Sequence, residues 1–312
     1  MSTNQYVATL ESGSNDRTMI LNMGPQHPST HGVLRLLLEI DGETVLRMMP
    51  DIGYLHTGIE KTYEAKFYQQ CVPLADRMDY LSPFTNELGY VLAVEKLLGI
   101  EPPERAQWIR VLMSEFSRIN SHLVWLGTHA LDIGAMSVFL YCFREREDVL
   151  RLFEALAGQR MFDSYFRVGG VAMDVPLDFF ARCKKFIDAF PSKIDEYENL
   201  LTGNPIFVGR TKGVAYMSAE DAIALGASGP TLRGSGVDID FRRDAPYSGY
   251  EKFQFNVPVK KEGDVFARYL CRVAELREST KIVQQCLAGM PGGPIKADAT
   301  KIVLPDREKM KT

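Results

Sequence analysis

A helical period of apolar residues runs from Thr57 to about residue 203, and it constrains the fold of this chain most strongly. The pattern predicts one helix that ends at Gly99 and a much longer one that opens at Pro102-Pro103, because proline suits the first turn of a helix. The expected helices cover residues 85–98, 103–132, 135–157 and 177–201, the last bent at Pro191. Long helices with short links are typical of a bundle.

The residues before this stretch have a different character. Short runs with strand propensity cover 18–23, 33–40 and 44–49, and Asp41-Gly42 between the last two is a turn signal. These runs predict a small antiparallel β unit over residues 18–56. Residues 1–17 are polar and are expected to form a disordered lead.

Residues 204–262 are rich in Gly, Pro, Thr and aromatic residues, and we interpret them as a β-rich insertion. The insertion contains a short helix capped by Ser218, with Asp221 three residues later, and an alternating run over 253–259 that predicts a strand. A helix follows over 263–287. The expected fold class is α+β, with a helical domain over 57–312.

Composition excludes several classes of protein. A hydrophobic content of 46% and a charged content of 24% are typical of a globular protein with a core. The net charge of −4 argues against nucleic acid as a partner, and no apolar run approaches the ~18 residues of a membrane span. No Walker motif and no Gly-x-Gly-x-x-Gly after a strand is present, so nucleotide binding is unsupported.

The cysteines are odd in number and scattered, and no two form a Cys-x-x-Cys pair. This spacing supports neither a disulfide framework nor a metal or iron–sulfur site built by this chain alone. We expect reduced thiols buried as small hydrophobic side chains. The five residues are Cys71, Cys142, Cys183, Cys271 and Cys286.

The block Gly24-Pro-Gln-His27-Pro-Ser-Thr-His31-Gly32 holds two of the five histidines, four residues apart. On a helix that spacing would direct both imidazoles at one metal ion. Pro28 and Gly32 oppose a helix, so a tight loop is expected. A stiff loop with two imidazoles suits proton delivery better than a tetrahedral zinc site.

Two further groups of residues leave alternatives open. Tyr80 either packs its ring or serves as a phenolic proton donor, and Arg77 either forms a structural ion pair or raises the electron affinity of a nearby redox centre. His122, Trp125, His129 and Asp132 share one helix face. A histidine there is more often a hydrogen-bonded core residue than a ligand. A carboxylate such as Asp132 at a helix end suits pairing with an imidazole from elsewhere.

Five segments together resemble the family of the 49-kDa subunit (the D-type subunit) of respiratory complex I, the proton-pumping NADH:quinone oxidoreductase. They are Gly24-Pro-Gln-His-Pro-Ser-Thr-His-Gly-Val-Leu-Arg35, Tyr54-Leu-His-Thr-Gly-Ile-Glu-Lys61, Asp76-Arg-Met-Asp-Tyr80, Leu92-Ala-Val-Glu-Lys-Leu97 and Leu131-Asp-Ile-Gly-Ala135. The resemblance runs from about residue 18 to 312, and the His-Pro-Ser-Thr-His-Gly block is highly specific.

The resemblance implies a fold similar to the large subunit of nickel–iron hydrogenases. Asp79 and Ser82 stand where hydrogenases have metal-binding cysteines, and a soft-metal site needs thiolates, so the cavity is expected to take quinone instead. The resemblance implies that His31 and Tyr80 hold the quinone headgroup and that Asp132 pairs with His31. It implies that Arg77 lies near the terminal 4Fe-4S cluster of a neighbouring B-type subunit. His27 and Thr30 are implied to belong to the quinone-site loop.

The resemblance also implies a setting. Quinone is the substrate, and this chain alone holds no cofactor. The expected partners are subunits of types B, C and I and the membrane subunit of type H. The expected location is the cytoplasmic face of the bacterial inner membrane, where the chain associates with the membrane through the complex. The alternatives are a hydrogenase-like large subunit and a scaffold in a ferredoxin- or F420-linked complex.

Two departures from the family accompany these expectations. The family usually continues past Thr312, so a C-terminal part is expected to be missing. Many members also carry a histidine after the Arg-Met pair, where this chain has Phe162 after Arg160-Met161, and we do not transfer that histidine's role.

Overall fold

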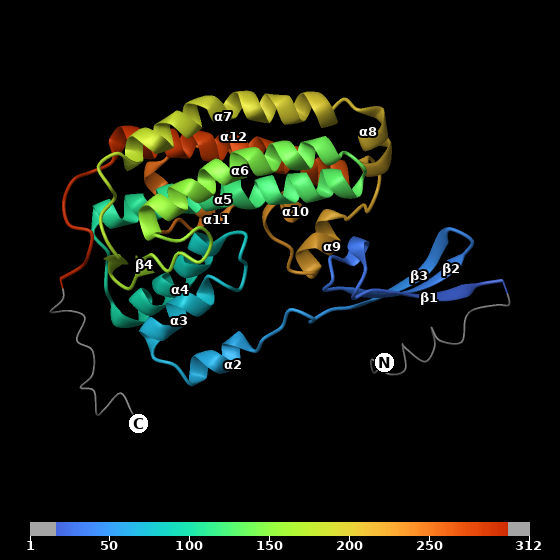
Figure 1. Cartoon of the computed structure of the whole chain (residues 1–312), viewed down its shortest axis with the longest axis horizontal. Coiled ribbons are helices and arrows are strands. Elements are labelled where there is room, and N and C mark those ends of the chain that lie inside the picture. The colour runs from blue at the N-terminus through green and yellow to red at the C-terminus, as the bar shows by residue number, and fades with distance from the viewer. Residues whose placement is uncertain (1–16, 299–312) are drawn as a thin grey trace. The chain divides into compact units, whose positions relative to one another are not determined.

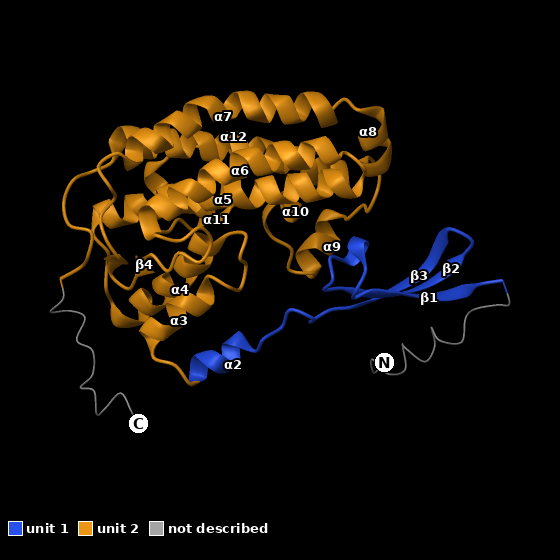
Figure 2. Ribbon diagram, viewed as in Figure 1, with its two compact units in different colours: residues 1–64 blue, residues 65–312 orange. Residues whose placement is uncertain are grey.

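The computed structural model of the chain describes residues 17–298. Two compact units divide it, residues 1–64 and residues 65–312 (Figures 1 and 2). The expected disordered lead over 1–17 lies outside the described residues, apart from Arg17.

Unit 1 is built on an antiparallel sheet of order β1-β2-β3, which confirms the predicted β unit. Its strands are β1 (Met19–Met23), β2 (Arg35–Asp41) and β3 (Thr44–Asp51), followed by α2 (Ile59–Glu64). Gly42 closes the β2–β3 turn at a φ of +61°, a conformation that favours glycine. The predicted turn signal therefore lies where the chain reverses.

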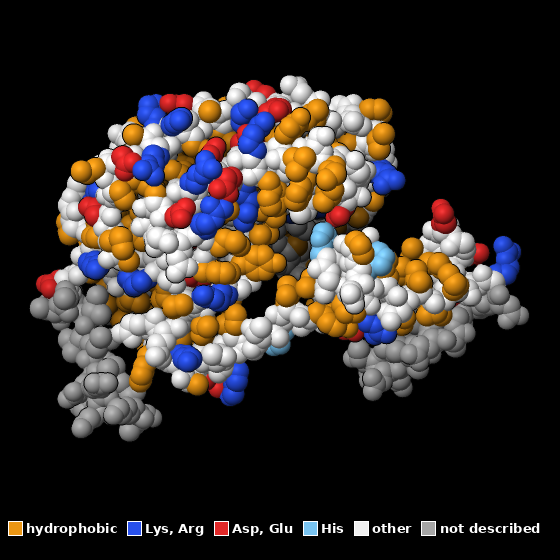
Figure 3. All heavy atoms as spheres, viewed as in Figure 1, with side chains coloured by type: hydrophobic (Ala, Val, Ile, Leu, Met, Phe, Trp, Pro, Cys, Tyr) orange, Lys and Arg blue, Asp and Glu red, His pale blue; other side chains and the backbone are white. Residues whose placement is uncertain are grey.

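One face of this sheet is wholly apolar. Cross-strand partners share a face, so the register Leu21↔Leu38↔Met48 and its neighbours two residues away define it. Met19, Leu21 and Met48 on this face are 56%, 39% and 57% exposed. Hydrophobic side chains are visible over these strands in Figure 3.

Unit 2 is a helical domain. Its long helices are α4 (Pro83–Leu98), α5 (Glu104–Asp132), α6 (Met136–Ala157), α7 (Phe179–Leu201) and α12 (Val265–Gly289), and α3 (Tyr68–Ala75) precedes them. The bounds confirm the predicted helices to within two or three residues. Gly99 ends α4 in the left-handed conformation, as the sequence predicts.

Helix α5 forms the centre of the core. It packs against α4, α6 and α12, and α7 in turn packs against α6 and α12 (Figure 1). Its inward residues recur at three- and four-residue spacing and are fully buried: Ile109, Leu112, Phe116, Ile119, Leu123, Leu126 and Ala130. A buried α5 therefore provides a rigid axis on which polar side chains can be placed.

The prediction of a β-rich insertion over 204–262 is wrong. The described residues there form α8 (Pro205–Thr211), α9 (Ala219–Ala224), α10 (Gly229–Arg233), α11 (Phe241–Asp244) and the 3-10 turn η2 (Tyr250–Lys252), and no strand. Ser218 does cap α9, because its hydroxyl accepts the amide of Asp221 at 3.0 Å.

The alternating run 253–259 does not form the predicted strand, for a physical reason. Its backbone bonds to side chains of α12 instead of a neighbouring strand: the amide of Gln254 donates to Gln285 and that of Asn256 to Glu278, both at 2.8 Å. Phe253, at the start of this run, is buried, so the alternation of apolar and polar residues reflects packing against a helix.

A short hairpin, β4 (Phe166–Arg167) and β5 (Gly170–Val171), packs against α4 and α5 and was not predicted. Among the described residues, no helix is both long and apolar enough to cross a membrane.

Candidate functional site

The histidine block forms a tight loop around one 3-10 turn, η1 (Pro28–Thr30), in unit 1. The predicted loop is confirmed. The Nδ1 of His27 accepts the amide of Ser29 at 3.1 Å, and the hydroxyl of Thr30 donates to the carbonyls of Pro25 and His27. Thr30 is buried, whereas His27 and His31 are exposed. Thr30 thus braces the loop that presents the two imidazoles.

His31 leaves the turn in the left-handed conformation, with a φ of +53°. Non-glycine residues adopt this region at a cost, and such residues are frequent at functional sites. The loop therefore fixes the direction of the Cα–Cβ bond of His31 through backbone geometry.

In unit 2, Arg77, Asp79 and Tyr80 lie on the turn between α3 and α4. Asp79 accepts the amide of Leu81 at 3.2 Å, and its carbonyl accepts the side-chain amide of Asn86 at 2.8 Å. The side chain of Tyr80 is 45% exposed, and its hydroxyl has no hydrogen-bond partner among residues 17–298. A rigid turn thus presents a phenol whose hydrogen-bonding capacity is unused.

Two polar residues of α5 hold this turn in place. The side-chain amide of Asn120 donates to the carbonyl of Leu81 at 2.8 Å, and the hydroxyls of Ser117 and Ser82 lie 3.2 Å apart. Both α5 residues are buried. They were not predicted from the sequence, although two polar residues three apart on an apolar helix face were a visible signal.

Arg77 does not form an ion pair with any described residue. Its guanidinium lies over the ring of Phe162, 4.6 Å from the centroid, and donates to the carbonyl of Pro73. The side chain is exposed. The guanidinium of Arg77 is therefore a surface charge on the same turn as Tyr80, and the cation–π contact with Phe162 holds it in place.

Asp132 is the last residue of α5 and is exposed. The helical rise places it about 18 Å along the axis from Asn120, where the Tyr80 turn is anchored. The contact of the Tyr80 turn with α5 and the position of Asp132 therefore lie at separate points along that helix. His31 belongs to unit 1, so its pairing with either remains a prediction.

The two histidines of α5 differ in role. The Nε2 of His122 lies 2.7 Å from a carboxylate oxygen of Glu275 on α12, which confirms the hydrogen-bonded core interpretation for that residue. Burial lowers the pKa of His122. His129 stacks on Trp125 at 5.7 Å between centroids, and its Nε2 has no partner among the described residues.

The cysteines are all buried, as predicted. Burial raises the pKa of the Cys142, Cys183 and Cys286 thiols, which keeps them protonated at neutral pH. Within residues 17–298, no group of three or more His, Cys, Asp or Glu side chains is arranged to hold a metal ion.

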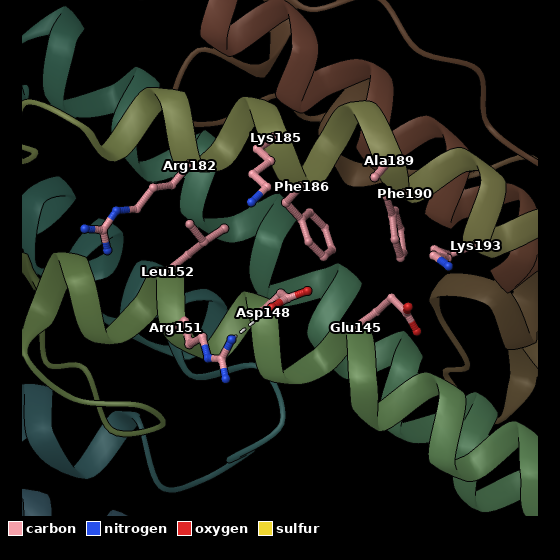
Figure 4. A pocket seen from close by; sticks show the side chains of 10 residues that line it. All are labelled: Glu145, Asp148, Arg151, Leu152, Arg182, Lys185, Phe186, Ala189, Phe190 and Lys193. Atoms are coloured by element: carbon pink, nitrogen blue, oxygen red, sulfur yellow. Dashed lines mark ion pairs between the residues drawn. The ribbon is translucent and has the colours of Figure 1, made fainter.

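A groove of about 350 Å³ between α6 and α7 lies apart from these residues (Figure 4). Phe186, Phe190 and Leu152 line it, and Arg182, Lys185, Lys193 and Arg151 surround them. Carboxylates pair with three of the four cations: Asp178 with Arg182, Glu196 with Lys193, and Asp148 with Arg151. The groove contains no residue predicted for the site.

The sequence of this chain matches one family model and several known proteins. The family model described as respiratory-chain NADH dehydrogenase, 49 Kd subunit, matches residues 132–312. A Koribacter versatilis protein, named as a D-type subunit of NADH-quinone oxidoreductase, is 78% identical over 97% of this chain and 75% of its own length. A Solibacter usitatus protein, also named as a D-type subunit of NADH-quinone oxidoreductase, is 64% identical over 99% of this chain and 76% of its own length. A Trichlorobacter lovleyi protein named in the same way is 56% identical over 95% of this chain and 76% of its own length.

The fold and the matches define a subunit of a respiratory oxidoreductase complex. The chain belongs to the 49 kDa subunit family of respiratory-chain NADH dehydrogenase, complex I. The family resemblance inferred from the five sequence segments is thereby confirmed.

Proposed function

We propose that this chain forms the quinone-reduction site of an NADH-quinone oxidoreductase, together with a partner subunit that carries the terminal 4Fe-4S cluster. Its relatives are named as subunits of NADH-quinone oxidoreductase. The observation that carries the proposal is Tyr80: an exposed phenol with an unused hydroxyl, on a turn that is fixed to the central helix and also bears the cation of Arg77.

The chemistry of quinone reduction suits these groups. Two electrons convert a quinone into a strongly basic dianion that needs two protons. A phenol, with an ordinary pKa near ~10, and an imidazolium, near ~6.5, both protonate such a base. In the proposal, Tyr80 and His31 bond to the headgroup and supply these protons, and Asp132 holds the imidazole in its charged form.

Arg77 serves the electron side of the reaction. A positive charge stabilises the reduced state of a nearby redox group, so Arg77 close to the partner's cluster would raise that cluster's electron affinity. Its exposed position and its cation–π contact, which leaves the charge uncompensated, support this role.

The finer architecture follows the family. We infer a fold similar to that of the nickel–iron hydrogenase large subunit, with an N-terminal unit that carries the histidine loop. At the positions of the hydrogenase cysteines, Asp79 accepts the amide of Leu81 and Ser82 accepts the hydroxyl of Thr85 at 2.7 Å. These oxygen atoms are engaged within the turn, and a soft metal needs thiolates. Subunits of types B, C, I and H are the proposed partners, at the cytoplasmic face of the inner membrane.

The test uses the assembled complex that contains this chain. Tyr80→Phe and His31→Ala should each lower NADH-driven quinone reduction by about 10²-fold, the scale of a lost proton donor. Reduction of the iron–sulfur clusters by NADH, followed by electron paramagnetic resonance, should stay intact.

Tyr216→Phe is the matched control, since Tyr216 is 68% exposed in unit 2 and no role is proposed for it. Full quinone reduction in both the Tyr80 and His31 variants would refute the proposed site.

A further inference from the structure

Three buried carboxyl groups from separate segments meet beside the Tyr80 turn. Asp76 follows the end of α3, Glu87 lies in α4, and Asp163 lies in the loop between α6 and β4. Their exposed fractions are 0%, 0% and 5%. Carboxyl groups are almost never this buried unless they are paired.

The hydrogen bonds around the cluster are incomplete. Ser164 donates to Asp76 Oδ2 through its amide at 2.9 Å and its hydroxyl at 2.7 Å, and the amides of Tyr165 and Phe166 donate to Glu87. Asp76 Oδ1 and both carboxyl oxygens of Asp163 are buried without a partner among the described residues. Each such atom carries a desolvation cost that a proton or a donor would remove.

Among the described residues, no basic side chain forms an ion pair with any of the three carboxyl groups. The charged groups that act on Glu87 are Asp76 and Asp163, and the one that acts on Asp163 is Asp76. The basic residues nearest in sequence are engaged elsewhere. Arg77 covers Phe162, and Arg167 donates to the carbonyls of Ser164 and Phe166.

The electrostatic consequence is a cluster that retains protons. Burial raises the pKa of Glu87 well above its usual range, and the hydrogen bond with Asp76 and the charge of Asp76 add to this effect. Burial and the charge of Asp76 raise the pKa of Asp163 to about 8. Burial and the neighbouring carboxyl groups therefore favour the protonated forms of Glu87 and Asp163.

We propose that Asp76, Glu87 and Asp163 form a proton store that holds exchangeable protons at neutral pH and supplies them to the Tyr80 segment during quinone reduction. A proton on Glu87 bonds to Asp76, and a second resides on Asp163. The destination of these protons rests on the function proposed above, whereas their presence does not.

The chain itself limits the distance to Tyr80. Four peptide links separate Asp76 from Tyr80, so their Cα atoms lie within about 15 Å of each other. Reduction of one quinone consumes two electrons, which NADH supplies, and two protons. If Tyr80 gives one proton, its O–H bond breaks and a phenolate remains. The store then reprotonates the phenolate and refills from water.

The direct test is infrared spectroscopy on the purified, assembled complex, titrated from acid to alkaline pH. The wild-type enzyme should show protonated carboxyl absorption at neutral pH that disappears with a midpoint near pH 8. Asp163→Asn should remove this component, and Glu87→Gln should remove the one that persists to higher pH. Asp178→Asn, at an exposed carboxylate, is the matched control. A complex with no protonated carboxyl signal at neutral pH, or variants with an unchanged signal, would overturn the proposal.

A kinetic readout separates the store from the quinone site. In Asp163→Asn, quinone reduction should decline more steeply with rising pH than in the wild type, while NADH oxidation with an artificial acceptor stays unchanged. If Tyr80→Phe is fully active and the carboxyl signal is present, the quinone assignment fails and the store remains. If the signal is absent and Tyr80→Phe is inactive, the store fails alone.

Discussion

Arg110 of α5 and Glu95 of α4 form a bidentate ion pair inside the core, with N–O distances of 2.6 and 2.9 Å and side chains 0% and 3% exposed. The same guanidinium donates to the carbonyls of Arg167 and Gly170, and Glu95 accepts the amide of Gly169. The pair therefore fixes the β4–β5 hairpin to the two helices.

Arg110→Met should be severely destabilising, because it leaves the Glu95 carboxylate buried without a counter-charge. The expected loss is about 3–5 kcal/mol of unfolding free energy, measured by denaturation of the purified protein. Lys184→Met, which breaks an exposed pair with Asp188, should cost no more than about 1 kcal/mol. Equal losses in the two variants would contradict this account.

Stability should fall in acid because of Glu115. Burial alone would raise the pKa of Glu115, but the charges of Arg118 and Arg242 and the hydroxyls of Ser279 and Tyr250 lower it to about 2. A lowered pKa means that the stabilisation is complete above the unfolded value of 4.5 and is lost as pH falls toward 2. Thermal unfolding midpoints should drop across this range. Glu115→Gln should be less stable at neutral pH and show a shallower drop, and a drop as steep as in the wild type would count against Glu115.

Gly170→Ala should disrupt the hairpin. A Cβ atom there would lie 2.1 Å from the carbonyl oxygen of Ile295, in a segment whose backbone pairs with residues 169–171. Neither backbone can yield without losing hydrogen bonds, so the unfolding midpoint should fall. Gly89→Ala in α4 is the control. A Cβ there meets nothing within 4 Å, and the change should stabilise the helix by roughly 0.5–1 kcal/mol.

Asp132→Asn should separate stability from activity. A carboxylate at the C-terminus of α5 opposes the helix dipole, so its removal should leave stability unchanged or raise it by about 0.3–1 kcal/mol. Quinone reduction should nevertheless fall, because the proposed partner of His31 loses its charge. Asp178→Asn supplies the comparison for both measurements. An active Asp132→Asn enzyme would remove Asp132 from the proposed site.

The elements that the sequence predicts are those with a local cause. Ser218 caps a helix with its own hydroxyl, and Gly99 ends one through its own backbone freedom. The strands β4 and β5 have two residues each, too short for any period to appear, and they depend on Arg110 far away in the sequence. The run 253–259 fails for a related reason, because the partners of its amides lie on α12.

The residues of the candidate site also fall into those that the sequence predicts and those that only the structure brings together. His31 and Tyr80 stand out in the sequence through short motifs, and the structure adds how each is presented. The spacing of Ser117 and Asn120 marks them as polar positions on an apolar helix face, but their partners on the Tyr80 turn appear only in the structure. The Asp76–Glu87–Asp163 cluster arises only when distant segments meet, so residue spacing does not predict it. Asp163 lies in the loop after α6, and its partners Asp76 and Glu87 lie far away in the sequence.

The bare apolar face of the unit 1 sheet has a consequence for how the subunit is produced in the cell. A chain that exposes Met19, Leu21 and Met48 on one face of its sheet is a substrate for chaperones and proteases until a partner protein covers those side chains. Synthesised in excess over its partners, the protein should be short-lived, and its abundance should follow the supply of whichever chain it meets first.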